Sequence, residues 1–357
     1  MPHHKRVLIT GATGRQGLAV VRALLHSQKE KDPDNDNFHI LALTRNARSK
    51  SAEESLGTLG NQVTVVEGDL SSVDSMRGVF ERWKEEGGIW GVFSVQVFPG
   101  LGVDAIEEEA QGKVIADVAL EHGVACFVYS SSERAEEIFD DDAPEGSSHL
   151  AKVRIERHIK ELGERGLHWT ILRPVRFMEN YSGPYGAITF SVFKAGLKPT
   201  TVMDLVAAND VGRIVTGIFK NPEPYDSQIL VPLGDRLTCS KQEEIYRKTT
   251  GQSISRIPNF LALGIWALNK HTRIMLQSIE RFSEAYLSGK LPHIDSQVAL
   301  AKTTFRGEFT SFEEWSRERG RATNQAGTSK DGGTSTQTEP PADWNRISLF
   351  KLFSGRH

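Results

Sequence analysis

Three glycines at regular spacing lie in VLITGATGRQG, residues 7–17. Gly11, Gly14 and Gly17 follow a short apolar run and precede the apolar residues LAVV. Glycine lets the backbone turn tightly and approach a ligand closely. The amino end of a following helix favours an anion. We therefore interpret this segment as a cradle for a dinucleotide pyrophosphate, with a structural turn as the alternative. Its GxxGxxG spacing differs from the GxGxxG of many dehydrogenases.

Basic residues follow the next apolar segment, FHILALT at 38–44. Arg45, Arg48 and Lys50 come before any acidic residue. An NAD site places an acid here to accept from the ribose hydroxyls, whereas an NADP site needs a cation for the 2′-phosphate. Arg45 is the best placed, because a guanidinium can bind phosphate through two hydrogen bonds. The pattern favours NADP(H) over NAD(H), and a solvated basic turn is the alternative.

The elements that must hold these groups alternate along the first half of the chain. Apolar strand-like segments separated by helical ones lie at 6–10, 38–44, 62–69, 89–96, 124–132 and 168–174. This alternation predicts an α/β fold, a doubly wound parallel Rossmann sheet covered on both faces.

We expect the Rossmann domain at 1–174 and a smaller, mostly helical, mixed α/β lobe at 175–318. Within the lobe, NDVGRIVTGIFKN (209–221) predicts a helix capped by Asn209 or Asp210. Residues 319–343 contain no Leu, Ile, Val or Phe, which predicts a disordered tail over 319–357. Its end, WNRISLFKLFSGRH (344–357), is basic and apolar, so it is either a docking element or a frayed terminus.

Composition narrows the function classes. The net charge of -3 over 357 residues gives no reason to expect direct nucleic-acid binding. Only two cysteines occur, without CxxC or Cys/His spacing, so we expect no metal site and a reducing compartment. The N-terminal segment has no signal-peptide pattern, and the apolar run 260–268 is too short to span a bilayer. These features predict a cytoplasmic, possibly nuclear, protein without a transmembrane segment.

Several motifs together resemble the NmrA-like family, atypical members of the extended short-chain dehydrogenase/reductase superfamily. They are GATGRQG, TRNARSK, VVEGD, QGKVIADVALEHGVACFVYSSSE, ILRPVRFMENY and FTSFEEW. The resemblance covers roughly residues 5–318. It implies NADP(H) bound between a Rossmann domain and a smaller lobe. By position, it implies a cofactor site made of Gly11, Ala12, Thr13, Gly14, Arg15, Gln16, Gly17, Arg45, Asp69, Leu70, Val95, Gln96, Lys152, Phe177, Met178, Glu179 and Asn180.

One position departs from the superfamily pattern. Short-chain dehydrogenases use Tyr-x-x-x-Lys, which puts both side chains on one helix face. Here Lys152 is present, but Ser148 stands at the tyrosine position. Lys152 can still hold a nicotinamide ribose, and it is the candidate catalytic residue. Substitute proton donors left open are His149 and the tyrosines at 129, 181 and 185.

The missing tyrosine leaves two function classes. One is an NADPH-dependent reductase of a small quinone-like or conjugated carbonyl substrate, because such acceptors can take a hydride with water as the acid. The other is an NADP(H) redox sensor that regulates a protein partner such as a transcription factor, as the resemblance also implies. We favour the reductase, since Lys152 and the RFMENY segment (176–181) are kept. The sequence gives no oligomeric state.

Overall fold

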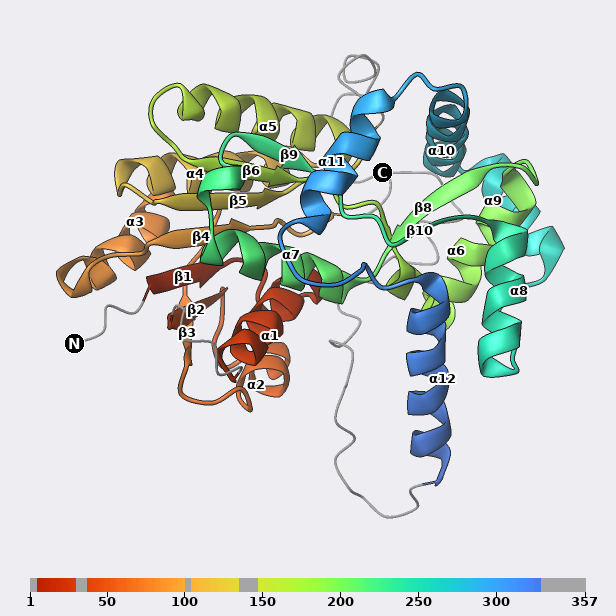
Figure 1. Ribbon diagram of the computed structural model, residues 1–357, viewed down its shortest axis with the longest axis horizontal. Helices are drawn as coiled ribbons and strands as arrows, with labels where there is room; N and C mark the ends of the chain where they lie inside the picture. The colour runs from red at the N-terminus through yellow and green to blue at the C-terminus, as the bar shows by residue number, and fades with distance from the viewer. Residues whose placement is uncertain (1–4, 30–36, 100–103, 135–146, 329–357) are drawn as a thin grey trace.

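A seven-stranded parallel sheet forms the larger layer of the computed structural model, which describes residues 5–29, 37–99, 104–134 and 147–328 (Figure 1). The strand order is β3-β2-β1-β4-β5-β6-β9. The strands are β1 (Lys5–Ile9), β2 (Phe38–Thr44), β3 (Val63–Glu67), β4 (Gly91–Ser94), β5 (Cys126–Ser130), β6 (Trp169–Leu172) and β9 (Gln228–Leu230). The order reverses between β1 and β4, and ligands bind at the carboxyl ends of the strands near such a reversal. This order confirms the predicted doubly wound Rossmann sheet.

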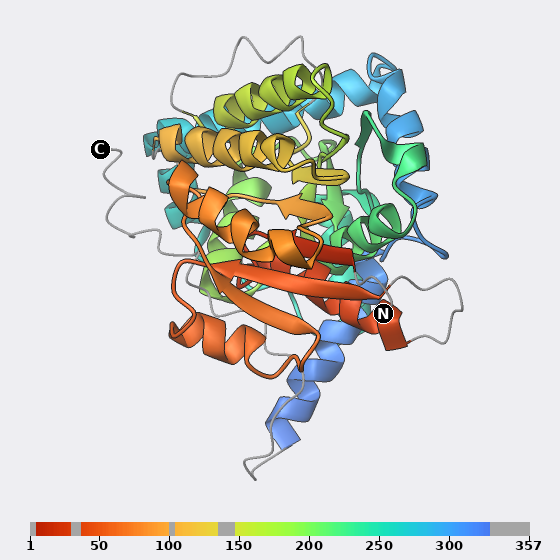
Figure 2. The same cartoon turned by 90° about the vertical axis from the view of Figure 1, so that its left-hand side faces the viewer.

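Helices cover both faces of this sheet (Figures 1 and 2). One apolar core joins the sheet to α1 (Arg15–Lys29), α2 (Lys50–Leu56) and α7 (Ala208–Lys220). The other core joins it to α3 (Val73–Trp83), α4 (Ile106–Glu121) and α5 (Ser148–Gly163). A short 3₁₀ turn, η1 (Lys84–Glu86), follows α3. The strands are therefore buried on both sides, as their continuous apolar runs predict.

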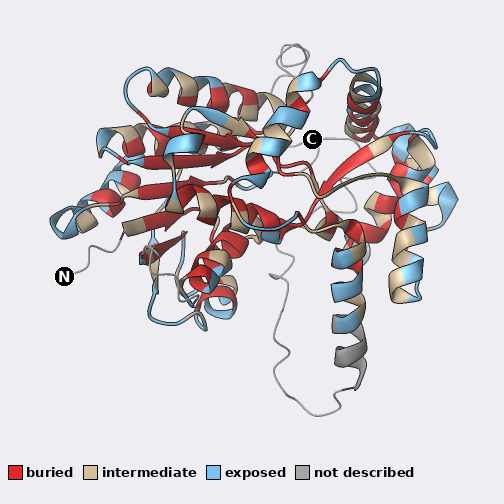
Figure 3. Ribbon diagram, viewed as in Figure 1, coloured by how far each residue is buried: buried red, intermediate tan, exposed pale blue. Residues whose placement is uncertain are grey.

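A smaller lobe packs beside the sheet around a core of its own (Figure 3). Its three-stranded sheet has the order β10-β8-β7. The lobe strands are β7 (Arg176–Phe177), β8 (Val202–Val206) and β10 (Asp235–Thr238), and its short turn is η3 (Met178–Tyr181). The turn η4 (Glu223–Tyr225) belongs to the main layer, because Tyr225 packs in the core beneath α1 and α7. The lobe helices are α6 (Gly183–Gly196), α8 (Cys239–Thr250), α9 (Asn259–Leu268), α10 (Lys270–Leu287) and α12 (Phe312–Thr328). Helix α11 (Pro292–Lys302) joins the two layers, with Ala301 in the main core and Ile294 packed against Phe282 of α10.

The two layers exchange elements across the predicted boundary at residue 174. Both α7 and β9 come from the later half of the chain, yet they belong to the main sheet layer. The predicted cap of α7 is wrong, because the helix begins at Ala208 with Ala207 at its N-cap position. Asp210 is buried instead and accepts from the Thr310 backbone N–H at 2.8 Å. Burial raises the pKa of Asp210 despite this bond and its ion pair with Arg213.

The C-terminal part differs from the predicted tail at one point. Helix α12 continues to Thr328, so regular structure extends ten residues beyond the predicted boundary at 318. At Gly320 an added Cβ would lie 3.3 Å from Thr250 on α8, which places the two helices in close contact. The terminal segment 344–357 and the acidic stretch EEIFDDDAPEG (136–146) lie outside the described residues. Among the described helices, none has the length and apolar character needed to cross a bilayer.

Candidate functional site

The glycine loop between β1 and α1 folds as a tight turn that only glycine permits. Gly11 has φ +56°, a left-handed conformation that side chains disfavour. Its carbonyl accepts from the Gly14 backbone N–H at 2.8 Å. A Cβ on Gly17 would lie 2.3 Å from that same carbonyl oxygen, whereas one on Gly14 would lie 3.2 Å from it. Gly11 and Gly17 therefore set the turn, and the backbone of this loop is bare enough for a pyrophosphate.

Side chains on two neighbouring strands fix the loop at the carboxyl edge. The Thr10 hydroxyl donates to the Val95 carbonyl at 2.9 Å and accepts from the Val95 backbone N–H at 2.8 Å. Ser130, the last residue of β5, donates to Gln16 Oε1 at 2.7 Å. Gln96 is buried and donates to Ser94 at 2.9 Å. Gln16, Val95 and Gln96 thus lie together along the strand ends, as the cofactor hypothesis requires.

The turn after β2 carries two exposed guanidinium groups. Arg45 and Arg48 are exposed, and neither forms an ion pair with any carboxylate in the described part of the chain. Asn46 Oδ1 accepts from the Arg48 backbone N–H at 2.9 Å, and Glu67 Oε1 accepts from the Ala47 backbone N–H at 2.8 Å. A turn held this way offers free cations to a phosphate.

The loop after β3 presents the two residues expected beside the adenine. Asp69 is exposed, and its Oδ1 accepts from the Ser71 backbone N–H at 2.9 Å. Leu70 is half-buried and packs against the apolar core that lies between the sheet and helices α3, α4 and α5. Both residues follow Glu67, the last residue of β3, which is paired with Thr44 at the end of β2. They therefore lie at the same carboxyl edge of the sheet as the turn after β2.

Lys152 lies in the first turns of α5 and faces a buried acid on α4. Its Nζ is 2.8 Å from Glu108 Oε1. The Glu108 side chain is 1% exposed and that of Lys152 is 15% exposed, so the lysine side chain is partly accessible while the carboxylate is enclosed. Ser148 donates its hydroxyl to Glu108 Oε2. The residue at the tyrosine position is thereby bound to the lysine's counter-ion.

A second buried carboxylate, Glu156, lies on α5, one helical turn after Lys152. Glu156 is paired with Arg134 and with Arg173, at 2.6 and 2.7 Å for its Oε2. All three side chains are at most 3% exposed. Burial opposes ionisation here, but the two guanidiniums outweigh it and lower the pKa of Glu156 to about 2. This cluster is closed to solvent and joins β6 to α5.

The lobe meets the glycine loop through η3. Arg15 donates to Asn180 Oδ1 at 2.7 Å and to the Glu179 carbonyl at 3.3 Å. Glu179 Oε1 accepts from the Ala208 backbone N–H at 3.0 Å, which orders the segment. Phe177 is half-buried, whereas Met178 is fully buried in the lobe core. Of the four residues expected at the nicotinamide end, Met178 therefore offers no accessible side chain.

Two of the candidate substitute tyrosines, Tyr129 and Tyr181, are held in cores, and the side chain of Tyr185 lies outside the described residues. Tyr129 is fully buried, and burial raises its pKa well above the ordinary value. Tyr181 is 7% exposed, packs edge-on against Phe190, and has a pKa raised by burial. Neither phenol is placed to protonate a bound substrate. The described part of the chain also contains no group of three His, Cys, Asp or Glu side chains arranged to hold a metal ion.

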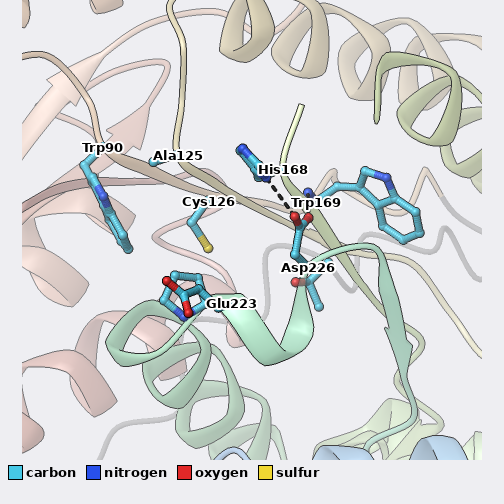
Figure 4. Close-up of a pocket in the computed structure, with 9 residues that line it drawn as sticks. Trp90, Ala125, Cys126, His168, Trp169, Glu223 and Asp226 are labelled. Carbon is cyan, nitrogen blue, oxygen red and sulfur yellow. Dashed lines mark hydrogen bonds and ion pairs between the residues drawn. The ribbon is translucent and has the colours of Figure 1, made fainter. Parts of the chain in front are cut away.

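A separate pocket opens at the opposite, amino-terminal edge of the sheet (Figure 4). Its volume is about 380 Å³, and its walls include Trp90, Cys126 and Glu223. His168 Nδ1 is 2.7 Å from Asp226 along one side. Burial raises the pKa of the Cys126 thiol to about 12, so it is not a thiolate nucleophile at neutral pH. This pocket lies apart from every predicted site residue, at the other end of the strands.

Comparison with known proteins bears on the family and the fold. The model of the NmrA-like family matches residues 3–316. The chain belongs to the NmrA-like family. Its relatives include an NmrA-like family domain-containing protein of Dictyostelium discoideum, 29% identical over 261 residues, which covers 70% of this chain and 79% of that protein. The oxidoreductase ptmS of Penicillium ochrochloron is 28% identical over 273 residues, covering 70% and 74%.

Solved structures show the same fold. NmrA, a negative transcriptional regulator, superposes with a TM-score of 0.63 at 18% identity, covering 91% of this chain and 98% of that one. NmrA has also been solved with NADP, and that structure gives a TM-score of 0.62 at 19% identity with the same coverage. At these identities the likeness establishes the fold of this NmrA-like chain and nothing finer.

Two residues of the site were missed by sequence reasoning. Glu108 lies in the acidic run EEE in the first turn of α4, a pattern typical of a solvent-exposed helix start. Only the packing of α4 against α5 shows that it faces Lys152. Glu67 ends β3, and its role in the turn after β2 depends on strand register, Thr44 opposite Glu67. Neither contact leaves a local signal in the sequence.

Proposed function

We propose that this NmrA-like protein is an NADP(H)-dependent oxidoreductase that acts on a small quinone-like or conjugated carbonyl substrate. The observation that carries the proposal is the pair Lys152–Glu108 at the carboxyl edge. A buried carboxylate anchors a partly exposed ammonium where the nicotinamide ribose would lie. That is an arrangement for holding and polarising a ligand. A surface lysine without such an anchor would be free to move.

NADP(H) is the cofactor that the free cations favour. Arg45 and Arg48 have no carboxylate partner among the described residues, and the turn before α1 is built on Gly11 and Gly17. NmrA has been solved with NADP and with NAD. Relatives from Penicillium ochrochloron and Aspergillus flavus carry the description NmrA-like family domain-containing oxidoreductase. Together these findings support nicotinamide dinucleotide binding, with the 2′-phosphate near Arg45.

The residues present limit the chemistry. A bound NADPH supplies a hydride. Lys152 orients the ribose and adds positive charge beside the reacting region, while Glu108 and Ser148 hold its position. Ser148 donates its hydroxyl to Glu108, and the phenols of Tyr129 and Tyr181 are buried, so none of these three residues supplies the proton in this proposal. A quinone or conjugated carbonyl fits this site, since its reduced product is a stabilised anion that water can protonate.

The direct test is NADPH oxidation, followed at 340 nm, with panels of quinones, conjugated carbonyls and isolated ketones. We expect turnover of the first two classes and little with the third. Substitution Lys152→Met should abolish most turnover, while Lys160→Met, at a half-buried lysine two turns further along α5 and outside the site, should leave it unchanged. Saturable NADPH binding with no oxidation by any acceptor would contradict the oxidoreductase proposal.

One contact supports the alternative of a redox sensor. Arg15 joins the glycine loop directly to Asn180 of η3, so a cofactor in the loop can alter how the lobe is held. The NmrA neighbour is a negative transcriptional regulator. A sensor would bind a protein partner, in the cytoplasm or nucleus, differently with NADP⁺ and NADPH. Partner capture in the presence of each form, compared with Arg15→Ala, tests this candidate.

A further inference from the structure

The turn after β2 is braced by an acid from the neighbouring strand. Thr44 and Glu67 are opposite one another in the parallel pairing of β2 and β3. The Gly68 backbone N–H donates to the Thr44 carbonyl at 3.0 Å, so the two strand ends stay together. From there Glu67 Oε1 reaches the Ala47 backbone N–H at 2.8 Å. A carboxylate is thus built into the turn that carries Arg45 and Arg48.

This carboxylate is not neutralised by a cation. Glu67 is exposed and forms no ion pair within the described residues. Its hydrogen bond to Ala47 holds its charge at the turn, where a free side chain would move away from an incoming anion. A 2′-phosphate that binds Arg45 must therefore come near a fixed negative charge.

We propose that Glu67 is a specificity-determining residue with two opposed effects on cofactor choice. Its hydrogen bond shapes the turn that presents Arg45, while its charge repels the 2′-phosphate and so narrows the preference for NADP over NAD. The inference rests on the proposed function, because it assumes a nicotinamide dinucleotide at this edge. On this inference, Glu67 at the end of β3 weakens the preference for NADP over NAD that Arg45 and Arg48 create.

Three variants separate the two effects. Glu67→Gln keeps an oxygen for the Ala47 N–H but removes the charge. Glu67→Ala removes both the brace and the charge. Glu53→Gln is the matched control, because Glu53 is an exposed acid on α2 that has no ion pair among the described residues and does not contact the turn.

Calorimetric titration of each full-length variant with NADP⁺ and with NAD⁺ gives the two dissociation constants. We expect Glu67→Gln to bind NADP⁺ about three- to tenfold more tightly, the size expected for one nearby charge in a partly aqueous site. Its NAD⁺ affinity should stay within about twofold of the original. The gain should shrink at high salt, because screening weakens interactions between exposed charges. Glu67→Ala should bind NADP⁺ more weakly than Glu67→Gln, and the control should match the unaltered protein.

The outcomes distinguish this inference from the proposed function. If the unaltered protein binds neither dinucleotide, both proposals are overturned. If it binds NADP⁺ and Glu67→Gln leaves that affinity unchanged or weaker, only the role of Glu67 is overturned. A loss of NAD⁺ affinity in Glu67→Gln would likewise overturn it, because it would make Glu67 an acceptor for the ribose hydroxyls. Circular dichroism of each variant confirms that the fold is intact.

Discussion

Two buried carboxylates on the α4–α5 side of the sheet have opposite surroundings. Glu156 is enclosed by two arginines, and all three side chains are at most 3% exposed. Glu108 is equally buried, but its partner Lys152 is 15% exposed and its other contact is a serine. The first cluster satisfies its own charges and faces no solvent. The second leaves the lysine side chain partly accessible, and this difference separates a structural ion cluster from a candidate site.

The closed cluster should show the largest effect when it is broken. Replacing Glu156 by Gln leaves two buried guanidiniums without a counter-ion, a loss of about 3–5 kcal/mol in unfolding free energy. Urea unfolding measures this loss of stability. The control is Glu161→Gln at an exposed position on the same helix, which should keep the unfolding free energy within about 0.5 kcal/mol of the original protein. A Glu156 variant as stable as the control would remove the distinction between the two clusters.

The same variant has a defined pH dependence. The folded-state pKa of Glu156 is about 2, below its ordinary value of 4.5, so folding favours the ionised form. Its contribution to stability is therefore fully present above about pH 4.5 and is lost as the pH falls towards 2. The stability difference between the original protein and Glu156→Gln should narrow over this window. A difference that stays constant from pH 6 to pH 3 would contradict the depressed pKa.

The open pair should behave differently, because its cation serves a ligand. Lys152→Met is expected to lower the reductase kcat/KM by about 100-fold, within the range for a positioned proton-transfer or charged group. The substitution also leaves the buried Glu108 carboxylate without its cation, so the stability of the fold should fall. Adding Glu108→Gln removes the buried charge and should restore stability but not activity. Recovery of activity in the double variant would show that Lys152 has only a structural role.

These contrasts also show what a sequence can and cannot supply. The alternating apolar runs predicted a parallel sheet, because each strand of such a sheet is buried on both faces whichever strand it pairs with. The glycine turn could be predicted from the local backbone requirement for glycine, and the exposed cation Arg45 from the charges that follow the second strand. The Glu108–Lys152 contact depends on how α4 packs against α5, and the contact of α12 with α8 at Gly320 lies within the segment predicted as a tail. Such long-range contacts leave no local signal in the sequence.

Arg45 represents a third environment for a charged group, because it is exposed and forms no ion pair among the described residues. Arg45 contributes to no ion cluster in the described part of the chain, so Arg45→Ala should leave stability within about 0.5 kcal/mol. Loss of a charge-assisted phosphate contact should weaken NADP⁺ binding by about 2 kcal/mol, roughly 30-fold. NAD⁺ affinity should barely change, because NAD⁺ has no 2′-phosphate. Equal affinity of the unaltered protein for both dinucleotides would contradict this assignment.

The smallest expected effect comes from Ser148, the residue at the tyrosine position. Its hydroxyl donates to Glu108, so Ser148→Ala removes one bond to a carboxylate that still pairs with Lys152. We expect a stability loss of about 1 kcal/mol and a change in kcat/KM of less than about threefold, because the serine holds the counter-ion without touching the reacting atoms. Steady-state assays with a quinone acceptor and NADPH measure this directly, with thermal unfolding as the parallel readout. A 100-fold loss of kcat with unchanged stability would instead make Ser148 a proton donor, and the open pair would then be a serine-based catalytic site.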